Sequence, residues 1–448
     1  MAKWNYEGLR ASVPDVAESG TVSETLPESA LSKVRWRLIP FLFLLYVVAY
    51  LDRVNVGFAS IDMNRDLGFG NAVYGFGSGI FFISYTLLEV PSNLLLARVG
   101  ARVWIARIMI TWGIISTAMI FVNSATSFYV LRFLLGAAEA GFFPGLLYYL
   151  TLWFPARERA RTVALFMTAT AIAGVIGAPI SSALLRLHGV LGLRGWQWLF
   201  IVEGLPAILL APVVLRYLTE RPADAAWLTS DERNWLSKAM ADEHANTEGA
   251  HVTLRAAATS GRLWALATVY FLIVVAFYGV TFWLPQIIQA AGTLSSVTVV
   301  LISAIPYVVA AIGMVAIGIH SDSTGERRWH VAVPALIGAA GFILTVIAPS
   351  TTAISLATLS IAALGIWGAL GPLWTMPTAM LRGTAAAGGI AMVNTVGNVG
   401  GFVGPYMVGW ARDATGGFAG GLLFLAGCLI AAAAIVVSLK EPSPQQIR

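Results

Sequence analysis

Residues 38–58 read LIPFLFLLYVVAYLDRVNVGF, an apolar run with two charged residues near its end, Asp52 and Arg53. A helix needs about 20 mostly apolar residues to cross the hydrocarbon core of a bilayer, and this run has that length. A charged side chain at the bilayer centre costs roughly 2.5–3.5 kcal/mol on insertion scales. The run therefore predicts a membrane-spanning helix, and Asp52 and Arg53 predict a polar site within it.

The composition extends this prediction to the whole chain. Of 448 residues, 58% are hydrophobic and 11% are charged, and the mean hydropathy is +0.76. A soluble domain carries about 25% charged residues, so the composition excludes an ordinary soluble enzyme, a nucleic-acid-binding domain and a disordered protein. The apolar runs are long and rich in glycine, which favours helices over the short alternating strands of a membrane β-barrel. We predict an all-α membrane protein.

We predict twelve membrane-spanning helices, six on each side of a polar stretch. They are placed at 38–58, 73–96, 104–123, 126–149, 161–186, 197–216, 263–289, 294–319, 330–348, 352–380, 385–410 and 417–438. The tenth span is long enough to contain a break around Gly371 and Pro372.

The spans divide the chain into two predicted six-helix bundles related by pseudo-symmetry. The N-terminal bundle covers 35–216 and the C-terminal bundle covers 262–440. Between them, 217–261 reads as a cytoplasmic linker loop with a short helix. We expect residues 1–34 and 441–448 to be cytoplasmic tails, the first of them disordered.

The placement of lysine and arginine predicts the orientation, because these residues are enriched on the cytoplasmic side. With the N-terminus inside, the predicted outer loops hold only Arg65, Arg186, Arg194 and Arg412. Both termini are therefore predicted to be cytoplasmic. The net charge of +5 indicates orientation rather than a binding patch for nucleic acid.

Six charged residues lie deep within the predicted spans, all in the first half. They are Asp52, Arg53, Glu89, Arg132, Glu139 and Glu203. Arg132 and Glu139 are seven residues apart and share a helix face, whereas Asp52 and Arg53 point about 100° apart. We predict a switchable network in which protonation of Asp52 or Glu139 frees an arginine to bind an anion.

Each of these residues also has a structural interpretation. Arg132 and Glu139 could form an ion pair that locks the bundle, and Asp52 could be structural too. For Glu89, near the cytoplasmic end of its span, we favour a structural or gating role with inner-loop arginines as partners. Glu203 stays open between a structural and a functional role.

The second half offers uncharged polar and aromatic groups for a cavity between the halves. Asn394 and Asn398 lie one turn apart, and their amides can hold hydroxyls or carboxylates. Trp374 and, from the first half, Tyr85 are further candidates for the cavity wall. The alternative for any single aromatic residue is contact with lipid or packing in the core.

Three motifs carry a resemblance to a known family. Residues 51–59 read LDRVNVGFA and 132–145 read RFLLGAAEAGFFPG. Residues 318–328 read GIHSDSTGERR and match the pattern G-x-x-x-D-x-x-G-x-R-R. The chain resembles the anion:cation symporters of the major facilitator superfamily, which are bacterial permeases for organic acids such as tartrate, phthalate and sugar acids.

The resemblance implies residue roles and an inner-membrane location. Asp52 and Glu139 would carry protons, and Arg53 would hold the substrate carboxylate. Arg132 would pair with Glu139 and share the substrate anion, with Tyr85 at the cavity. The loop motif would form a cytoplasmic gate; its motif positions are Gly318, Asp322, Gly325, Arg327 and Arg328. Asp322 would accept hydrogen bonds from a neighbouring helix N-terminus and pair with arginines when that side is closed. The alternative is a charged turn that only shapes the loop.

Two segments depart from family patterns. The loop between the second and third spans has Asn93 and Ala97 where the gate motif has Gly and Asp. In the fifth span, residues 174–179 read GVIGAP, which only approximates the G-x-x-x-G-P pattern of drug/proton antiporters. The second departure weakens the prediction of an exporter.

The leading functional hypothesis is import of a small organic anion in symport with protons by alternating access. Its expected partners are an organic-acid substrate, protons and the lipid bilayer, with no nucleic acid and a monomeric state. The alternatives are a proton-coupled exporter of drugs or other solutes and a transporter-like ligand sensor. We expect no enzyme activity, no catalytic residues, no metal site and no cofactor, with the proton gradient as energy source.

Overall fold

The computed structural model describes residues 26–248, 259–380 and 384–439, and these residues form helices without a β-strand. Eleven of the described helical stretches are long and apolar enough to cross a membrane. The prediction of an all-helical multi-pass membrane protein is confirmed.

The helices follow the apolar runs of the sequence. Those before the central polar stretch are α1 Leu26–Leu67, α2 Asn71–Val99, α3 Ala101–Ala118, α4 Ala125–Glu139, α5 Phe142–Thr151, α6 Ala156–Leu185 and α7 Gly195–Tyr217. The short 3-10 helices η1 Met119–Phe121, η2 Val190–Gly192 and η3 Pro222–Asp224 join or follow them.

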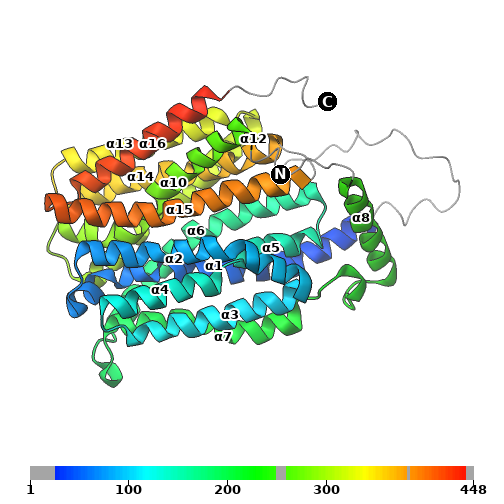
Figure 1. Ribbon diagram of the computed structural model, residues 1–448, viewed down its shortest axis with the longest axis horizontal. Helices are drawn as coiled ribbons and strands as arrows, with labels where there is room; N and C mark the ends of the chain where they lie inside the picture. The colour runs from blue at the N-terminus through cyan, green and yellow to red at the C-terminus, as the bar shows by residue number, and fades with distance from the viewer. Residues whose placement is uncertain (1–25, 249–258, 381–383, 440–448) are drawn as a thin grey trace, which may run out of the picture.

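The central polar stretch contains α8 Ser230–Glu248, and further helices follow it. They are α10 Gly261–Ala290, α11 Ser296–Ile302, α12 Ala304–Thr324, α13 Arg328–Ile347, α14 Thr352–Met380, α15 Thr384–Thr415 and α16 Ala419–Ser438. Most of them run along the long axis of the molecule, and α8 lies crosswise at one end (Figure 1).

The predicted span at 126–149 is broken into α4 and α5. Between them Gly141 has a φ of +86°, a left-handed conformation that favours glycine. A Cβ atom there would also lie only 2.4 Å from Ser92 Oγ. The break therefore depends on glycine, and it leaves Glu139 as the last residue of α4.

The expected break around Gly371 and Pro372 is wrong, because α14 continues as one helix from Thr352 to Met380. A proline inside a membrane helix is tolerated when nearby groups satisfy the freed backbone. Pro372 has no N–H for the carbonyl of Gly368, four residues earlier, yet the helix continues through this position.

The helix α15 covers the predicted span at 385–410 but is not among the eleven apolar stretches. It runs alongside α2 and α10 (Figure 1). Small residues allow this close approach: a Cβ atom on Gly75 of α2 would lie 2.6 Å from Pro405 O of α15. The contact between α2 and α15 joins the two halves of the sequence.

Helix α1 begins at Leu26, so the chain is helical before residue 35, where the sequence predicts that the tail ends. The extension is held by α8, because Lys33 Nζ donates to Glu232 Oε1 at 2.7 Å and Ser29 Oγ donates to the same oxygen at 2.8 Å. The hydrogen bond from Lys33 lowers the pKa of Glu232 to about 2, so this carboxylate is ionised at neutral pH. The rest of the predicted tail and residues 441–448 lie outside the described residues.

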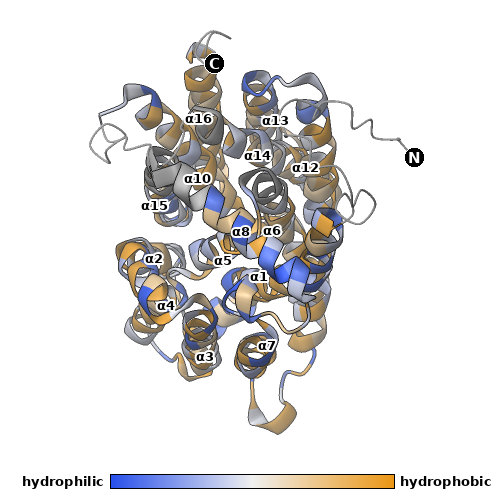
Figure 2. Cartoon of the chain, turned by 90° about the vertical axis from the view of Figure 1, so that its right-hand side faces the viewer, coloured by the Kyte–Doolittle hydropathy of each residue, from blue (hydrophilic) through white to orange (hydrophobic). Residues whose placement is uncertain are grey.

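Seen along the helix axes, helices from the first half gather in one part of the molecule and those from α10 onward in the other (Figure 2). The outward faces carry much of the hydrophobic colour, whereas α8 is largely hydrophilic. Elements of both parts meet along the middle, where α1 and α2 contact α10 and α15.

Candidate functional site

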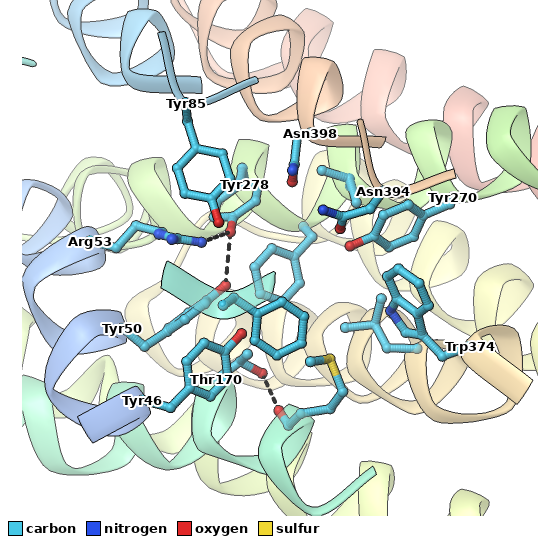
Figure 3. A pocket seen from close by; sticks show the side chains of 15 residues that line it. Tyr46, Tyr50, Arg53, Tyr85, Thr170, Tyr270, Tyr278, Trp374, Asn394 and Asn398 are labelled. Carbon is cyan, nitrogen blue, oxygen red and sulfur yellow. Dashed lines mark hydrogen bonds between the residues drawn. The ribbon is translucent and has the colours of Figure 1, made fainter. Parts of the chain in front are cut away.

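A cavity lies where helices from both halves of the sequence meet (Figure 3). Five of the six predicted substrate-binding residues line it: Arg53, Tyr85, Trp374, Asn394 and Asn398. The other polar residues in its wall are Tyr46, Tyr50, Thr170, Tyr270 and Tyr278. Its volume is about 50 Å³, which is room for a few water molecules.

Helix α1 presents Tyr46, Tyr50 and Arg53 to the cavity at helical spacing, so that one face of this helix forms a wall. Arg53 is 7% exposed, and its guanidinium group donates from Nη1 to the Tyr278 hydroxyl at 3.3 Å. Its Cζ atom also lies 5.1 Å from the ring centroid of Tyr85, a cation–π distance. The cavity wall therefore carries a buried positive charge.

The partner of this charge is Glu139, whose Oε1 atom accepts a hydrogen bond from Arg53 Nη2. Glu139 is buried at the end of α4 and does not line the cavity. Arg53 thus stands between its own carboxylate partner and the cavity. This arrangement can present the arginine to a ligand when the carboxylate is neutralised.

The expected pairing of Arg132 with Glu139 is wrong. Arg132 instead donates from Nε to Gly77 O at 3.3 Å and from Nη2 to Ser78 O at 3.0 Å, both on α2. Two helical turns separate Arg132 from Glu139 by about 10 Å along the axis, and the backbone of α2 offers acceptors nearer by. Arg132 is fully buried and does not line the cavity.

Asp52 points away from Arg53, as adjacent positions on a helix require. It accepts hydrogen bonds from Asn55 Nδ2 at 2.9 Å and from Ser116 Oγ of α3. Glu203 of α7 is also buried and accepts a hydrogen bond from Ser181 Oγ at 2.7 Å. Neither carboxylate lines the cavity.

Glu89 has partners on α15 rather than among inner-loop arginines, which corrects our expectation. Asn394 Nδ2 donates to Glu89 Oε1 at 2.6 Å, and Asn398 Nδ2 donates to Glu89 Oε2 at 3.2 Å. The Glu89 side chain is buried, and its hydrogen bonds to these two residues of the cavity wall link α2 to α15.

Comparison with known proteins assigns the family, because the sequence model of the Major Facilitator Superfamily matches residues 42–405. The chain belongs to the major facilitator superfamily. Members of this superfamily are membrane transporters, so the chain is a transporter and not an enzyme. This confirms the predicted resemblance at the level of the superfamily.

Relatives of this superfamily member are similar over nearly their whole length. A protein of Agrobacterium vitis named "Putative tartrate transporter" is 51% identical over 96% of this chain and 95% of its own. The "Quinolone resistance transporter" of Acinetobacter baumannii is 41% identical over 89% of this chain and 92% of its own.

A solved structure supports the superfamily fold. The xylose transporter XylE from Escherichia coli, in a partially occluded inward-open conformation, aligns with a TM-score of 0.70 at 14% identity. The alignment covers 88% of this chain and 96% of XylE.

The superfamily motif at 318–328 covers the last turns of α12, the short connection after it and the first residue of α13. Arg327 Nη1 donates to Asp322 Oδ1 at 2.6 Å, the acid–arginine contact that we expected. Glu326 caps the N-terminus of α13, since Trp329 N donates to Glu326 Oε1 at 2.7 Å. Gly325 ends α12 with a φ of +70°. Gly318 lies inside α12, and Arg328 Nη1 donates to Leu439 O at 3.2 Å.

Sequence reasoning missed most of the tyrosines around Arg53. Tyr50 donates a hydrogen bond to the Tyr278 hydroxyl at 3.2 Å, and Tyr270 lies beside Asn394 in the cavity (Figure 3). The spacing of Tyr46, Tyr50 and Arg53 along one helix face was a usable signal for α1. Tyr270 and Tyr278 belong to α10, and no sequence spacing predicts that they lie next to α1.

Proposed function

We propose that this transporter imports a small organic anion in symport with protons by alternating access. The substrate would be a carboxylate such as tartrate, a sugar acid or an aromatic acid. The name of the Agrobacterium relative supports the substrate class, and the arginine in the cavity wall supports an anion. Its partners would be the substrate, protons and the lipid bilayer. The transporter would work as a monomer and would need no cofactor.

The proposed membrane topology is twelve spans in two bundles with both termini in the cytoplasm. The lysine and arginine distribution supports this orientation. The membrane would be the bacterial inner membrane, because proteins that span the outer membrane are predominantly β-barrels. In this topology the turn between α1 and α2 faces outward.

The buried pair of Arg53 and Glu139 is the observation that carries the proposal. Arginine stays charged in proteins, so its charge in the cavity wall must be balanced by an anion. While Glu139 is ionised, it supplies that anion. When Glu139 takes up a proton, a substrate carboxylate can replace it on Arg53. Proton and anion then bind together because one buried charge substitutes for another.

Asp52 would be the second proton site. Its carboxylate is buried and accepts hydrogen bonds from the uncharged side chains of Asn55 and Ser116. It lies next to Arg53 in α1, so a change of charge at Asp52 acts on the helix that carries the anion site. Arg132 would act as a positioning residue that ties α4 to α2 beside the cavity.

Alternating access requires contacts between the halves that open on one side at a time. On the proposed outer side, Asp413 of α15 accepts hydrogen bonds from Asn71 Nδ2 at 2.7 Å and from Ala72 N at 2.8 Å. Ser296 Oγ also donates to Asp62 Oδ2 at 2.8 Å. These contacts would hold the outer side closed and would break when substrate enters.

The test is uptake of labelled tartrate, with sugar and aromatic acids in parallel, into proteoliposomes with and without a proton gradient. We expect gradient-driven uptake by the natural protein. Glu139→Gln should lose the response to the gradient while keeping anion exchange, and Asp52→Asn should weaken coupling. Arg53→Ala should lower the uptake rate at least about tenfold, because the substrate loses a charge-assisted hydrogen bond. Full gradient-driven uptake by Glu139→Gln would refute its coupling role.

A proton-coupled exporter of drugs is the second candidate, favoured by the name of the Acinetobacter relative. The arginine in the cavity wall argues against a cationic drug. The discriminating measurement uses inside-out vesicles with an inward-acid gradient. Accumulation of a fluoroquinolone there, and no tartrate uptake in proteoliposomes, would favour export.

A further inference from the structure

The amides that we assign to the substrate already hold a carboxylate of the protein. Asn394 Nδ2 and Asn398 Nδ2 each donate to a different oxygen of Glu89, at 2.6 Å and 3.2 Å. Both asparagines line the cavity, and Glu89 is 4% exposed. The chain itself thereby makes the two-donor contact that a substrate carboxylate would make.

Glu89 depends on these two donors. A buried carboxylate costs several kcal/mol unless hydrogen bonds or a charge compensate it. Among the described residues, the charged or titratable groups around it are Arg53 on α1, Tyr85 one turn earlier on α2 and Tyr270 on α10. Arg53 is already bonded to Glu139. If a ligand took the two amides, Glu89 would have to become neutral or leave its place.

The cavity must also widen before it can hold an organic acid. Its volume of about 50 Å³ is far below the roughly 300 Å³ of a small ligand site. Glu89 lies one turn from Tyr85, about 6 Å farther along α2 toward the proposed cytoplasmic side. There it ties α2 to α15 and keeps the walls together.

We propose that Glu89 is a displaceable internal ligand of the Asn394 and Asn398 amides. It holds them when no substrate is bound. A substrate carboxylate takes the amides over when Glu89 accepts a proton from water and withdraws. The inference rests on the proposed function and deepens it.

The proposal defines a substrate class. Arg53, held by Glu139, and Asn394, held by Glu89, lie on opposite sides of the cavity (Figure 3). Each donor set is occupied by an internal carboxylate that a ligand carboxylate can replace. The matching ligand is a dicarboxylate, and each replacement takes up one proton, so that the dianion is accompanied by one proton at Glu139 and one at Glu89, besides the proton proposed for Asp52.

The test measures binding rather than transport. Tartrate binding to purified protein in lipid nanodiscs is followed by calorimetry between pH 5.5 and pH 8, with glycerate as the monocarboxylate. The variants are Glu89→Gln and Glu89→Ala, alone and in a Glu139→Gln, Asp52→Asn background, which removes the other two proposed proton sites from the pH profile. Glu203→Gln is the matched control, a buried membrane carboxylate away from the cavity.

We expect both Glu89 variants to bind tartrate about five- to tenfold more tightly at pH 8, because the amides are no longer occupied most of the time. In the Glu139→Gln, Asp52→Asn background, tartrate should still bind more tightly at low pH, and Glu89→Gln should abolish this remaining pH dependence. The Glu89 substitutions should increase the affinity for tartrate more than the affinity for glycerate. Glu203→Gln should bind like the natural protein.

Weaker or unchanged binding by folded Glu89 variants, with thermal unfolding as the check on folding, would overturn the proposal and make Glu89 a structural link. If the natural protein and all variants fail to bind any acid of the panel, the proposed function fails and this inference with it. Binding that responds to Glu89 without any uptake would leave the inference standing and refute only the proposed proton-coupled import of these acids.

Discussion

Arg53 reaches the cavity wall with contacts from three other helices. Glu139 comes from α4, Tyr278 from α10 and Tyr85 from α2. Its planar group bonds the carboxylate with one nitrogen and the tyrosine hydroxyl with the other. A lysine is a single point charge and cannot reproduce this fork.

This geometry predicts that two substitutions weaken tartrate binding by different amounts. Arg53→Lys should weaken tartrate binding by at least about tenfold, because a charge-assisted hydrogen bond contributes about 1.5–3 kcal/mol. Tyr278→Phe removes one neutral hydroxyl and should weaken binding by about two- to fivefold. Calorimetry on both variants checks the order. Equal binding by Arg53→Lys and the natural protein would show that charge alone holds the anion.

At the element scale, the division of one span into α4 and α5 positions Glu139. The helix ends at Glu139, and the chain turns at Ala140 and Gly141 before α5 begins. Glu139 therefore lies at the C-terminal end of α4, where its carboxylate bonds Arg53 of α1.

Gly141→Ala should destabilise the protein and impair uptake. A left-handed residue other than glycine costs about 1–2 kcal/mol, and the new Cβ atom would contact Ser92 Oγ. Gly371→Ala is the matched control, since a Cβ atom there meets nothing within 4 Å and α14 is helical. Thermal unfolding in detergent measures both. An unchanged midpoint for Gly141→Ala would mean that the turn rearranges without cost.

At the scale of the whole molecule, hydrogen bonds join α2 and α15 on both sides of the cavity, the proposed outer side and the proposed cytoplasmic side. Asp413 holds the proposed outer end, and Glu89 holds the proposed inner side. The small cavity between them fits a closed state. Opening on either side then requires the loss of one contact while the other remains.

Asp413→Ala should shift the protein toward an outward-open state. The carboxylate caps the N-terminus of α2, and the loss of a cap costs about 0.5–2 kcal/mol, or about two- to thirtyfold in population. Electron paramagnetic resonance with spin labels at the outer ends of α2 and α15 should show a longer distance between the two labels. The same distances in Asp413→Ala and the natural protein would show that other contacts hold this side.

Local patterns predicted most of the fold. The length and polarity of the apolar runs located the helices, because each membrane helix satisfies its own backbone. The breaks were harder to predict, since the break expected at Gly371 is absent and one occurs at Gly141. Both segments contain glycine close to proline, and the difference arises from how neighbouring helices pack against each of them.

For the site, residue type was more predictable than partnership. The cost of charge in lipid is enough to single out Asp52, Arg53 and Glu139 from the sequence. Five predicted wall residues do line the cavity. The predicted pairing of Arg132 with Glu139 is wrong because groups on other helices compete for both side chains. Backbone acceptors of α2 bind Arg132, and Arg53 of α1 binds Glu139.

By itself, the sequence determined that this protein is a helical membrane transporter with a few charges that must be buried, since hydrophobic length and charge cost act locally. Only the tertiary structure decided which groups those charges meet. Arg53 bonds a residue 86 positions away, and Glu89 bonds one 305 positions away. Such contacts depend on how closely whole helices pack, which no spacing along the chain encodes.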